Sequence, residues 1–327
     1  MRKVIAALLG PVLATAVLAG CSKEQAGTEG TAVSSGKKVH IIMVTHGAPG
    51  DPFWNAVKRG AEDAAKDFKV EFDYQSTSKV DPAEQARLIE AAIARKPDGL
   101  AVSILDPDAV AGPIKKAVAR GIPVISLNSG DAFFAKLGIL AHVGQAEEIA
   151  GRQAGERMAG EGVKNAICIN HGQGDKSAEL RCEGFTSAVA KAGGKAKQVV
   201  VSQGDPTGTQ RRIEAALKAD PSIDGVLGLG PVIFNPVKAA LSSTGKLGKL
   251  RFATFDLSPD ILAAVRDGQA DFAIDQQQYL QGYLPVEFLA QRLRLGICPT
   301  GLVLAGPNFV TKADAQAAIE LSKQGLR

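Results

Sequence analysis

The sequence predicts two α/β lobes, each a parallel sheet with helices on both faces. From Val39 onward, short apolar β-rich runs alternate with longer runs of helical periodicity. This alternation is typical of buried parallel strands that are joined by helices. The chain has 327 residues, which is more than one core of ordinary size holds, so two lobes are favoured over one.

The elements follow one another along the whole of this pattern. The expected strands are Val39–Thr45, Val70–Tyr74, Gly99–Ile104, Pro123–Leu127, Ala166–Asn170, Gln198–Val201, Gly225–Leu229, Arg251–Phe255 and Ala270–Asp275. The expected helices are Phe53–Phe68, Pro82–Arg95, Ala109–Arg120, Glu147–Glu161, Ser177–Ala192, Gly208–Ala219, Ile233–Ser243, Ser258–Asp267 and Tyr279–Leu295. Asp81, Asp106, Asp205 and Ser258 each precede a Pro, which predicts a capping side chain followed by Pro at the first helical position.

The N-terminus has the pattern of an export signal. An apolar run, Val4–Leu18, follows two basic residues and is shorter than the about 20 residues of a membrane span. Leu18-Ala19-Gly20-Cys21 resembles the lipobox of bacterial lipoproteins, which implies cleavage before Cys21 and lipid attachment to it. The alternative is an ordinary signal peptide with an unrelated Cys. We expect a signal peptide over 1–20 and a flexible, polar tether over 21–37.

Composition excludes several partners. The hydrophobic fraction is 45% and the charged fraction 22%, as in a globular protein. No basic run with interleaved aromatics is present, so we expect no nucleic acid partner.

Cys168 lies in a strand and Cys182 in the next helix, so a disulfide is one prediction and free buried thiols, with Cys298, are the other. Cys168 and His171 have the spacing of one metal-ligand pair, but no second pair completes a site, so we expect no metal.

Polar residues follow most of the predicted strands. In an open α/β sheet, ligands bind beyond the carboxyl ends of the strands. The residues at these ends are Thr45-His46, Asp106, Asn128-Ser129, Asn170-His171, Gly230, Asp256 and Gln276. They contain no paired carboxylates for acid–base work and no nucleophile with a base. We therefore expect a protein that is not an enzyme and needs no cofactor.

Five motifs stand in order along the chain. They are Asp51-Pro52-Phe53-Trp54, the run from Gly121 to Asn128, Arg181-Cys182-Glu183-Gly184-Phe185, Phe255-Asp256, and Asp267-Gly268 with Ala273-Ile274-Asp275-Gln276. Together they resemble the type I periplasmic sugar-binding proteins, in particular the ribose-binding class. The resemblance runs from about Val39 to about Pro307. It implies two Rossmann-like lobes joined by a three-strand hinge.

The same resemblance implies an organisation and a function. The N-terminal lobe would be 38–144 plus 276–306, and the C-terminal lobe 145–275 plus 307–327. A ligand that touches both lobes would stabilise their closure. The closed protein, expected to be a monomer, would then deliver a sugar or polyol to the membrane permease of an ATP-driven importer. A receptor module for chemotaxis or a sensor kinase is the alternative, whereas the export signal argues against a transcription regulator.

A sugar site needs hydroxyl donors and acceptors in one plane and aromatic rings beside them. The expected ligand contacts are Asp51, Phe53, Trp54, Asn128, Arg181, Asp256 and Gln276, with His46, His171 and Asp106 as further candidates. Arg181 would donate two N–H groups to adjacent oxygens. The structural alternatives are helix caps for the acids, core packing for the two aromatics and a solvated helix position for Arg181.

Two features depart from the ribose-binding pattern. Gly230-Pro231 stands where the family often has Asn-Asp, and Asn128-Ser129 stands where the ribose type has Asp-Arg. These changes argue against ribose and favour another pentose, a hexose or a linear polyol. The neighbours Gln277 and Gln278 leave the position of the hinge Gln open by one or two residues.

Overall fold

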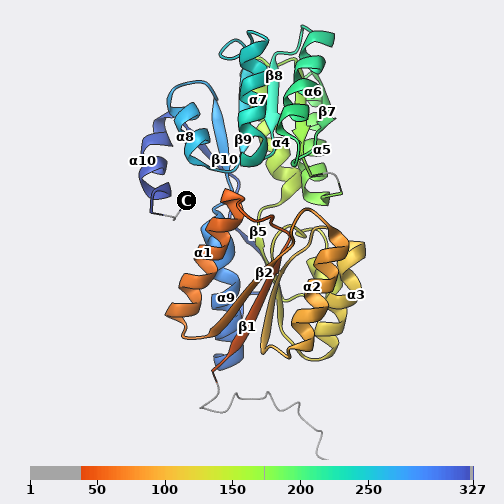
Figure 1. Ribbon diagram of the computed structural model, residues 1–327, viewed down its shortest axis with the longest axis vertical. Coiled ribbons are helices and arrows are strands. Elements are labelled where there is room, and N and C mark those ends of the chain that lie inside the picture. The colour runs from red at the N-terminus through yellow and green to blue at the C-terminus, as the bar shows by residue number, and fades with distance from the viewer. Residues whose placement is uncertain (1–37, 173, 325–326) are drawn as a thin grey trace, which may run out of the picture. The chain divides into compact units, whose positions relative to one another are not determined.

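The computed structural model describes residues 38–172, 174–324 and 327 (Figure 1). The predicted signal peptide, the tether and the lipid-attachment residue Cys21 lie outside these residues. Within the described part the strands form two six-stranded sheets. The prediction of two α/β lobes with largely parallel sheets is therefore confirmed.

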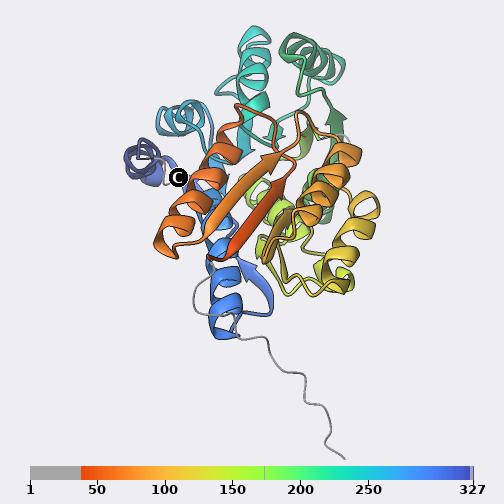
Figure 2. The same ribbon diagram turned by 60° about the horizontal axis from the view of Figure 1, so that its bottom comes forward.

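The first sheet is parallel throughout, with the order β11-β5-β4-β3-β1-β2. Its strands are β1 (His40–Thr45), β2 (Glu71–Ser76), β3 (Gly99–Ser103), β4 (Val124–Asn128), β5 (Ala141–Gly144) and β11 (Gly301–Leu304). Its helices are α1 (Pro52–Asp67), α2 (Pro82–Ala94), α3 (Pro107–Ala119) and α9 (Gln278–Leu295), with a 3-10 turn η1 (Phe134–Leu137). Figures 1 and 2 show α1 and α9 on one face of this sheet and α2 and α3 on the other.

Alternate residues of one strand serve the two faces of this sheet. Ile41 and Met43 pack in the core under α1 and α9, whereas Ile42 and Val44 pack in the core under α2 and α3. All four side chains are fully buried. A strand that is covered on both faces needs apolar residues without a break, which is why the sequence pattern of β1 was continuous.

The second sheet has the order β12-β10-β9-β8-β6-β7 and is parallel except for β12, which runs antiparallel to β10. Its strands are β6 (Asn165–Asn170), β7 (Lys195–Val200), β8 (Gly225–Gly228), β9 (Arg251–Phe255), β10 (Phe272–Asp275) and β12 (Asn308–Thr311). Its helices are α4 (Glu147–Gly160), α5 (Lys176–Lys191), α6 (Pro206–Ala219), α7 (Pro231–Ser243), α8 (Pro259–Arg266) and α10 (Lys312–Ser322).

Helices α4 and α5 approach each other closely, as α1 and α9 also do. A Cβ atom at Gly151 would collide with the backbone oxygen of Arg181, and one at Gly184 would collide with that of Glu148. Glycine is therefore required at both positions of this crossing. The close contact brings the first turn of α4 against the Arg181 side of α5, where the functional site lies.

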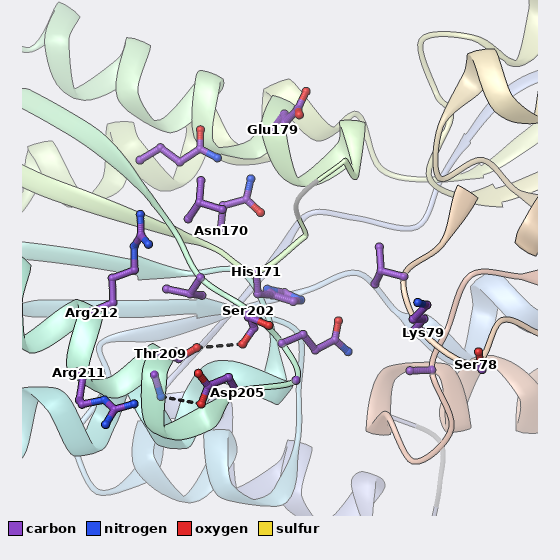
Figure 3. A pocket seen from close by; sticks show the side chains of 18 residues that line it. Ser78, Lys79, Asn170, His171, Glu179, Ser202, Asp205, Thr209, Arg211 and Arg212 are labelled. Atoms are coloured by element: carbon purple, nitrogen blue, oxygen red, sulfur yellow. Dashed lines mark hydrogen bonds between the residues drawn. The ribbon is translucent and has the colours of Figure 1, made fainter. Parts of the chain in front are cut away.

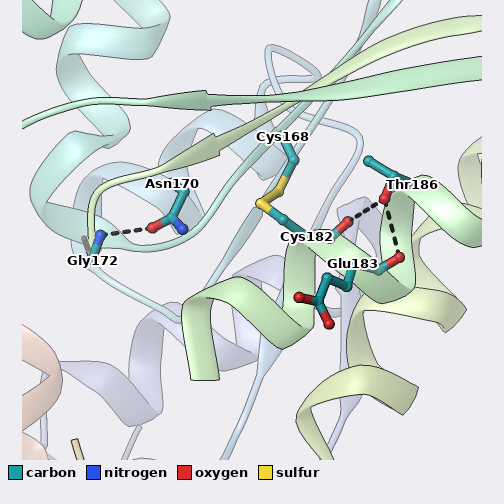
Figure 4. The surroundings of a disulfide bond; sticks show 6 residues. All are labelled: Cys168, Asn170, Gly172, Cys182, Glu183 and Thr186. Carbon is teal, nitrogen blue, oxygen red and sulfur yellow. Dashed lines mark hydrogen bonds between the residues drawn. A yellow bond between two sulfur atoms is a disulfide. The ribbon is translucent and has the colours of Figure 1, made fainter. Parts of the chain in front are cut away.

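A disulfide joins Cys168 of β6 to Cys182 of α5 (Figure 4). It encloses a sequence separation of 14 residues. The sequence left two predictions open for Cys168 and Cys182, a disulfide or free thiols, and the structure has the disulfide. Cys298 is free and half-buried.

Several short elements were missed in the sequence. Strands β5, β11 and β12 and helix α10 were not predicted, and β7 begins at Lys195 rather than Gln198. Each missed strand is four residues long, and β11 and β12 are partly exposed, so they lack a continuous apolar run. Strand β7 lies at a sheet edge, where its first half is polar and largely exposed. Helix α3 starts at Pro107, before the expected Ala109.

The chain passes between the sheets three times: after β5, after β10, and between β11 and β12. These crossings lie together, since the N–H of Ala305 donates to the oxygen of Gly144 at 2.6 Å. A Cβ at Gly306 would approach the backbone of Asp275 and Gln276 to 3.1 Å. Across the described ranges, no helix has the length and apolar character needed to cross a membrane.

Candidate functional site

Loops from both sheets line one cavity. Its lining residues are His46, Ala48, Asp51, Phe53, Trp54, Val80, Asn128, His171, Gly172, Asp175, Ala178, Arg181, Gln203, Leu229, Gly230, Pro231, Asp256 and Gln276. Every ligand contact expected from the sequence is among them except Asp106. The cavity lies beyond the carboxyl ends of the parallel strands, as the open-sheet rule predicts.

Asp106 has the alternative role, that of a helix cap. Its Oδ1 accepts the N–H groups of Asp108 and Ala109, both at 2.9 Å, at the start of α3. Asp106 is not among the residues that line the cavity, so the structure gives no support to the expected contact with a ligand. Its carboxylate satisfies orphan donors of the helix instead.

Asp51 combines the two roles considered for it. Its Oδ1 accepts the N–H of Phe53 at 2.9 Å and caps α1, while the residue also lines the cavity. Burial raises the pKa of Asp51 to about 6, although the amides of Phe53 and Trp54 oppose the shift. Since Oδ1 is engaged by the helix, Oδ2 is the oxygen left to accept from a ligand hydroxyl.

Phe53 and Trp54 likewise serve both as cavity wall and as core. Their rings meet edge to face with centroids 5.1 Å apart, and His46 lies edge-on to Trp54 at 4.7 Å. Phe53 is 4% exposed and Trp54 8%, and both belong to the core under α1. The rings offer the apolar surface that the C–H face of a sugar needs.

Two site residues adopt left-handed backbone conformations directly after strands. Asn128 has φ 62° at the end of β4, and Asp256 has φ 66° just after β9. Asn and Asp tolerate this region better than other side chains. The turn directs the chain away from each sheet immediately at the cavity, which explains the residue types at these two positions.

A buried ion pair holds Arg181 in place. Its Nε donates to Oε2 of Glu147 at 2.6 Å, and its Nη2 donates to Oε1 at 2.9 Å. The Arg181 side chain is 8% exposed and that of Glu147 is fully buried. Burial alone would lower the pKa of Arg181, but the charge of Glu147 and its hydrogen bonds outweigh burial and raise it. Arg181 therefore stays charged, with its guanidinium 4.7 Å from the ring centroid of Phe255.

A hydrogen-bonded chain extends from this pair across the hinge. Nη2 of Arg181 donates to Oε1 of Gln276 at 3.1 Å, and Nε2 of Gln276 donates to Oδ1 of Asp256 at 2.5 Å. Gln276 lies in the crossing that follows β10, and its carbonyl accepts from Gln281 at 2.9 Å. Burial raises the pKa of Asp256 to about 7, against the opposing effects of Arg181 and Gln276.

The same contacts place the uncertain hinge glutamine. Gln276 lines the cavity. The N–H of Gln277 instead donates to Asp275 at 2.7 Å, and Gln278 begins α9. Of these three glutamines, only Gln276 is a cavity residue.

The geometry changes the expected role of Arg181. A guanidinium has five N–H groups; Nε and one N–H of Nη2 are used by Glu147, and the second N–H of Nη2 by Gln276. Two N–H groups remain, both on Nη1. If Arg181 donates two hydrogen bonds to a ligand, both therefore come from Nη1 and not from two different nitrogens of the guanidinium. Glu147 was missed in the sequence, because an acid in the first turn of a helix is a common dipole partner.

Two histidines face the cavity from opposite lobes. His46 follows β1, and its Nδ1 lies 2.7 Å from Oγ of Ser103. His171 follows β6, and its buried Nδ1 has no hydrogen-bond partner among the described residues. Burial lowers the pKa of His171 to about 4 and also lowers that of His46. Both imidazoles are therefore neutral at physiological pH.

A larger groove of about 1070 Å³ adjoins the cavity and shares Ala48, Val80, His171 and Gln203 with it. Figure 3 shows Ser78 and Lys79 on one side of the groove and Arg211 and Arg212 on the other. The first two lie after β2 and the last two on α6. The groove thus leads from the cavity to surface side chains of both lobes.

The chemistry of the site is that of recognition. In the part of the chain that the structure describes, no group of three or more His, Cys, Asp or Glu side chains could hold a metal. The cavity offers N–H donors from Arg181, carboxylate acceptors from Asp51 and Asp256, and aromatic surface from Phe53 and Trp54. This set matches a ligand that has several hydroxyl groups and exposed C–H faces.

Comparison with known proteins identifies the family. The model of the periplasmic binding protein domain matches residues 41–296, and the chain belongs to this family. The xylose/arabinose-binding protein XylF of Sulfolobus acidocaldarius is 26% identical over 302 residues, covering 86% of this chain and 73% of that protein. The ribose import binding protein RbsB of Bacillus subtilis is 25% identical over 297 residues, covering 88% of this chain and 92% of that protein.

Solved structures include similar proteins with bound ligands. A carbohydrate transporter from Acidothermus cellulolyticus in complex with myo-inositol is 36% identical, with a TM-score of 0.84, and covers 89% of this chain and 100% of that one. A solute-binding protein of an ABC transporter from Burkholderia graminis in complex with D-arabinose is 25% identical, with a TM-score of 0.76, and covers 85% of this chain and 96% of that one.

Proposed function

We propose that this protein is the substrate-binding component of an ABC importer and binds a monosaccharide or small polyol in the cavity between its lobes. The observation that carries the proposal is the mixed origin of the lining: Asp51 and Trp54 come from the first lobe, and Arg181 and Asp256 from the second. A ligand in contact with both sets favours closure by its differential affinity for the closed state.

The charges of the site favour a neutral ligand. Arg181 is compensated by Glu147, and His46 and His171 are uncharged because burial lowers the pKa of each. Burial raises the pKa of Asp256 to about 7, so this group carries less than a full negative charge near neutral pH. Asp51 and Asp256 accept hydrogen bonds, which each hydroxyl of a sugar or polyol can donate. Such a ligand satisfies the buried polar groups without introducing an unpaired charge.

Cyclic polyols are the first ligands to examine. The similar solved structure with 36% identity holds myo-inositol, and the one with 25% identity holds D-arabinose. Both are neutral rings with adjacent hydroxyl groups. The departures from the ribose pattern at Asn128 and Gly230 agree with a ligand other than ribose.

The organisation we propose follows the three crossings. The hinge lies at 144/145, 275/276 and 306/307, which separates a lobe of 38–144 plus 276–306 from one of 145–275 plus 307–327. The protein acts as an exported monomer, anchored by lipid on Cys21, and passes its ligand to a membrane permease. No observation gives separate support to a receptor role in chemotaxis or sensor-kinase signalling, and the relatives are binding proteins rather than enzymes.

A thermal-shift screen of the mature protein tests this proposal. The panel contains myo-inositol, D-arabinose, D-xylose, D-ribose, D-allose and D-glucose, with amino acids as the control class. A ligand at about 100 times its dissociation constant adds about 2.7 kcal/mol to the free energy of unfolding. We expect a neutral polyol or sugar to give the largest shift. Stabilisation by an amino acid alone would contradict the proposal.

A further inference from the structure

Ser103 forms a buried junction directly behind His46. It is the last residue of β3 and has no exposed surface. Its Oγ lies 2.7 Å from Nδ1 of His46 and 3.1 Å from the backbone nitrogen of the same residue. The side chain of Gln85 supplies a further contact, 3.0 Å from Nε2 to Oγ.

The orientation of Gln85 is fixed on both sides. Its Oε1 accepts the backbone N–H of Leu105 at 3.2 Å, and its Nε2 donates to the carbonyl oxygen of Ser103 at 2.8 Å. A backbone N–H can only donate and a carbonyl can only accept, so the amide cannot be turned the other way. The contact from Gln85 to Ser103 Oγ is therefore an N–H donation.

These donors decide what the hydroxyl of Ser103 does. A hydroxyl oxygen has two lone pairs and one hydrogen. The N–H of His46 and the amide of Gln85 occupy both lone pairs. The remaining contact, to Nδ1 of His46, must then use the hydroxyl hydrogen. Nδ1 is the acceptor, and the imidazole carries its proton on Nε2.

Nε2 of His46 is the ring nitrogen that remains available to a ligand. It has no hydrogen-bond partner among the described residues, and it is not one of their side-chain atoms that are fully buried without a partner. His46 lines the cavity beside Trp54, with the ring centroids 4.7 Å apart. The ring that carries this nitrogen is thus part of the cavity wall beside Trp54.

We propose that His46 is a specificity-determining residue that presents a fixed Nε2–H donor to one oxygen of the ligand, and that Ser103 is the positioning residue that fixes this tautomer. The inference rests on the proposed function and names the ligand class more closely. The ligand carries a neutral hydroxyl or ether oxygen at this point. A ligand without that oxygen leaves a buried N–H unpaired, and an ammonium group there brings donor against donor.

The chain contains a matched control in the next strand. Oγ of Ser126 in β4 lies 2.9 Å from Nδ1 of His142 in β5, and both residues are fully buried. Neither lines the cavity. Ser126→Ala therefore removes a serine–histidine hydrogen bond of the same kind without touching the proposed donor.

Nitrogen-15 NMR of the ligand-free protein reads the tautomer directly. We expect the Nδ1 signal of His46 in the unprotonated range and the Nε2 signal in the protonated range. Ser103→Ala should move the signals toward a mixture of tautomers, Ser103→Thr should restore them, and Ser126→Ala should leave them unchanged. A protonated Nδ1 in the wild type would overturn the inference whether or not any sugar binds.

Calorimetric titration with the tightest member of the panel tests the consequence for binding. We expect His46→Phe to weaken binding by about 10-fold to 100-fold, Ser103→Ala by several-fold, and Ser103→Thr and Ser126→Ala by less than two-fold. In the wild type, the monodeoxy analogue that lacks the oxygen facing His46 should bind more weakly than the parent ligand. In His46→Phe, this analogue and the parent ligand should bind equally well. If His46→Phe binds all analogues with wild-type preferences, the donor role is wrong, while the proposed function still stands on the parent ligand.

Discussion

Among single residues, Arg181 has two separable contributions, because its guanidinium both faces the cavity and neutralises Glu147. We expect Arg181→Met to weaken ligand binding by about 2–5 kcal/mol, since charged hydrogen bonds are lost from a desolvated site. It should also lower the free energy of unfolding by about 3–5 kcal/mol, because Glu147 is left buried and unpaired. Calorimetric titration and denaturant unfolding measure the two effects.

The control for Arg181 is the double variant with Glu147→Gln. Removing the charge of Glu147 should restore much of the stability but none of the affinity. If Arg181→Met keeps both wild-type stability and wild-type affinity, the buried pair and its position beside the ligand are both contradicted.

The carboxyl group of Asp256 should make stability depend on pH. Its pKa is raised from 3.8 to about 7 in the folded protein, whereas the unfolded chain ionises near the ordinary value. Between pH values equal to these two pKa values, the folded state binds more protons than the unfolded state, so the free energy of unfolding falls as the pH rises. Urea unfolding across this range should show that fall in the wild type relative to Asp256→Asn. If the free energy of unfolding has the same pH dependence in the wild type and in Asp256→Asn, the pKa of Asp256 is not raised in the folded protein.

For single residues, the sequence predicted which side chains line the cavity, but it did not predict the hydrogen bonds and the ion pair that hold them in position. Asp256 could be found because polar residues that follow parallel strands meet at one edge of a sheet, and Asp51 and Arg181 because they stand in motifs that resemble those of the sugar-binding family. Glu147 and Ser103 could not, because their roles depend on partners 34 and 57 residues away. Asp106 has the same Asp-Pro motif as the helix caps Asp81 and Asp205, and the sequence predicted all three caps. Only the fold shows that Asp106, unlike the cap Asp51, does not also line the cavity.

Among the elements, the disulfide between β6 and α5 should stabilise the second lobe. It closes a loop with a sequence separation of 14 residues, and a loop of about 15 residues corresponds to about 3 kcal/mol of stabilisation. We expect the double variant Cys168→Ser, Cys182→Ser to melt several degrees below the wild type, measured by calorimetry. Cys298→Ser is the matched control and should melt like the wild type. Equal melting of all three proteins would contradict a stabilising bridge.

The accuracy of the predicted elements followed the strength of their local apolar pattern. The long helices and the continuous apolar strands were found because a buried face imposes a period over many residues. Strands β5, β11 and β12 are stabilised by neighbours that are distant in sequence, as when Gly301 pairs with Ala141. Strands β8 and β10 are equally short but fully buried and could be found, whereas β11 and β12 are partly exposed and could not. The expected boundaries of the lobes came from the family resemblance and not from local pattern.

For the whole molecule, the lipobox-like sequence predicts attachment to a membrane through Cys21. Cys21→Ala should remove lipid from the protein and leave it unprocessed or released. Metabolic labelling with a fatty acid and fractionation of cells measure both effects. Normal membrane retention of the variant, with labelling unchanged, would exclude this residue as the anchor.

The central claim is that a sugar or polyol holds the two lobes together. Lys79 and Arg211 lie on opposite sides of the groove that adjoins the cavity (Figure 3), and both are exposed. Spin labels at Lys79→Cys and Arg211→Cys, in a Cys298→Ser background, report the distance between the lobes by double electron–electron resonance. With the tightest ligand of the panel, we predict a shorter and narrower distance distribution than without it. An unchanged distribution at saturating ligand would contradict closure around the ligand.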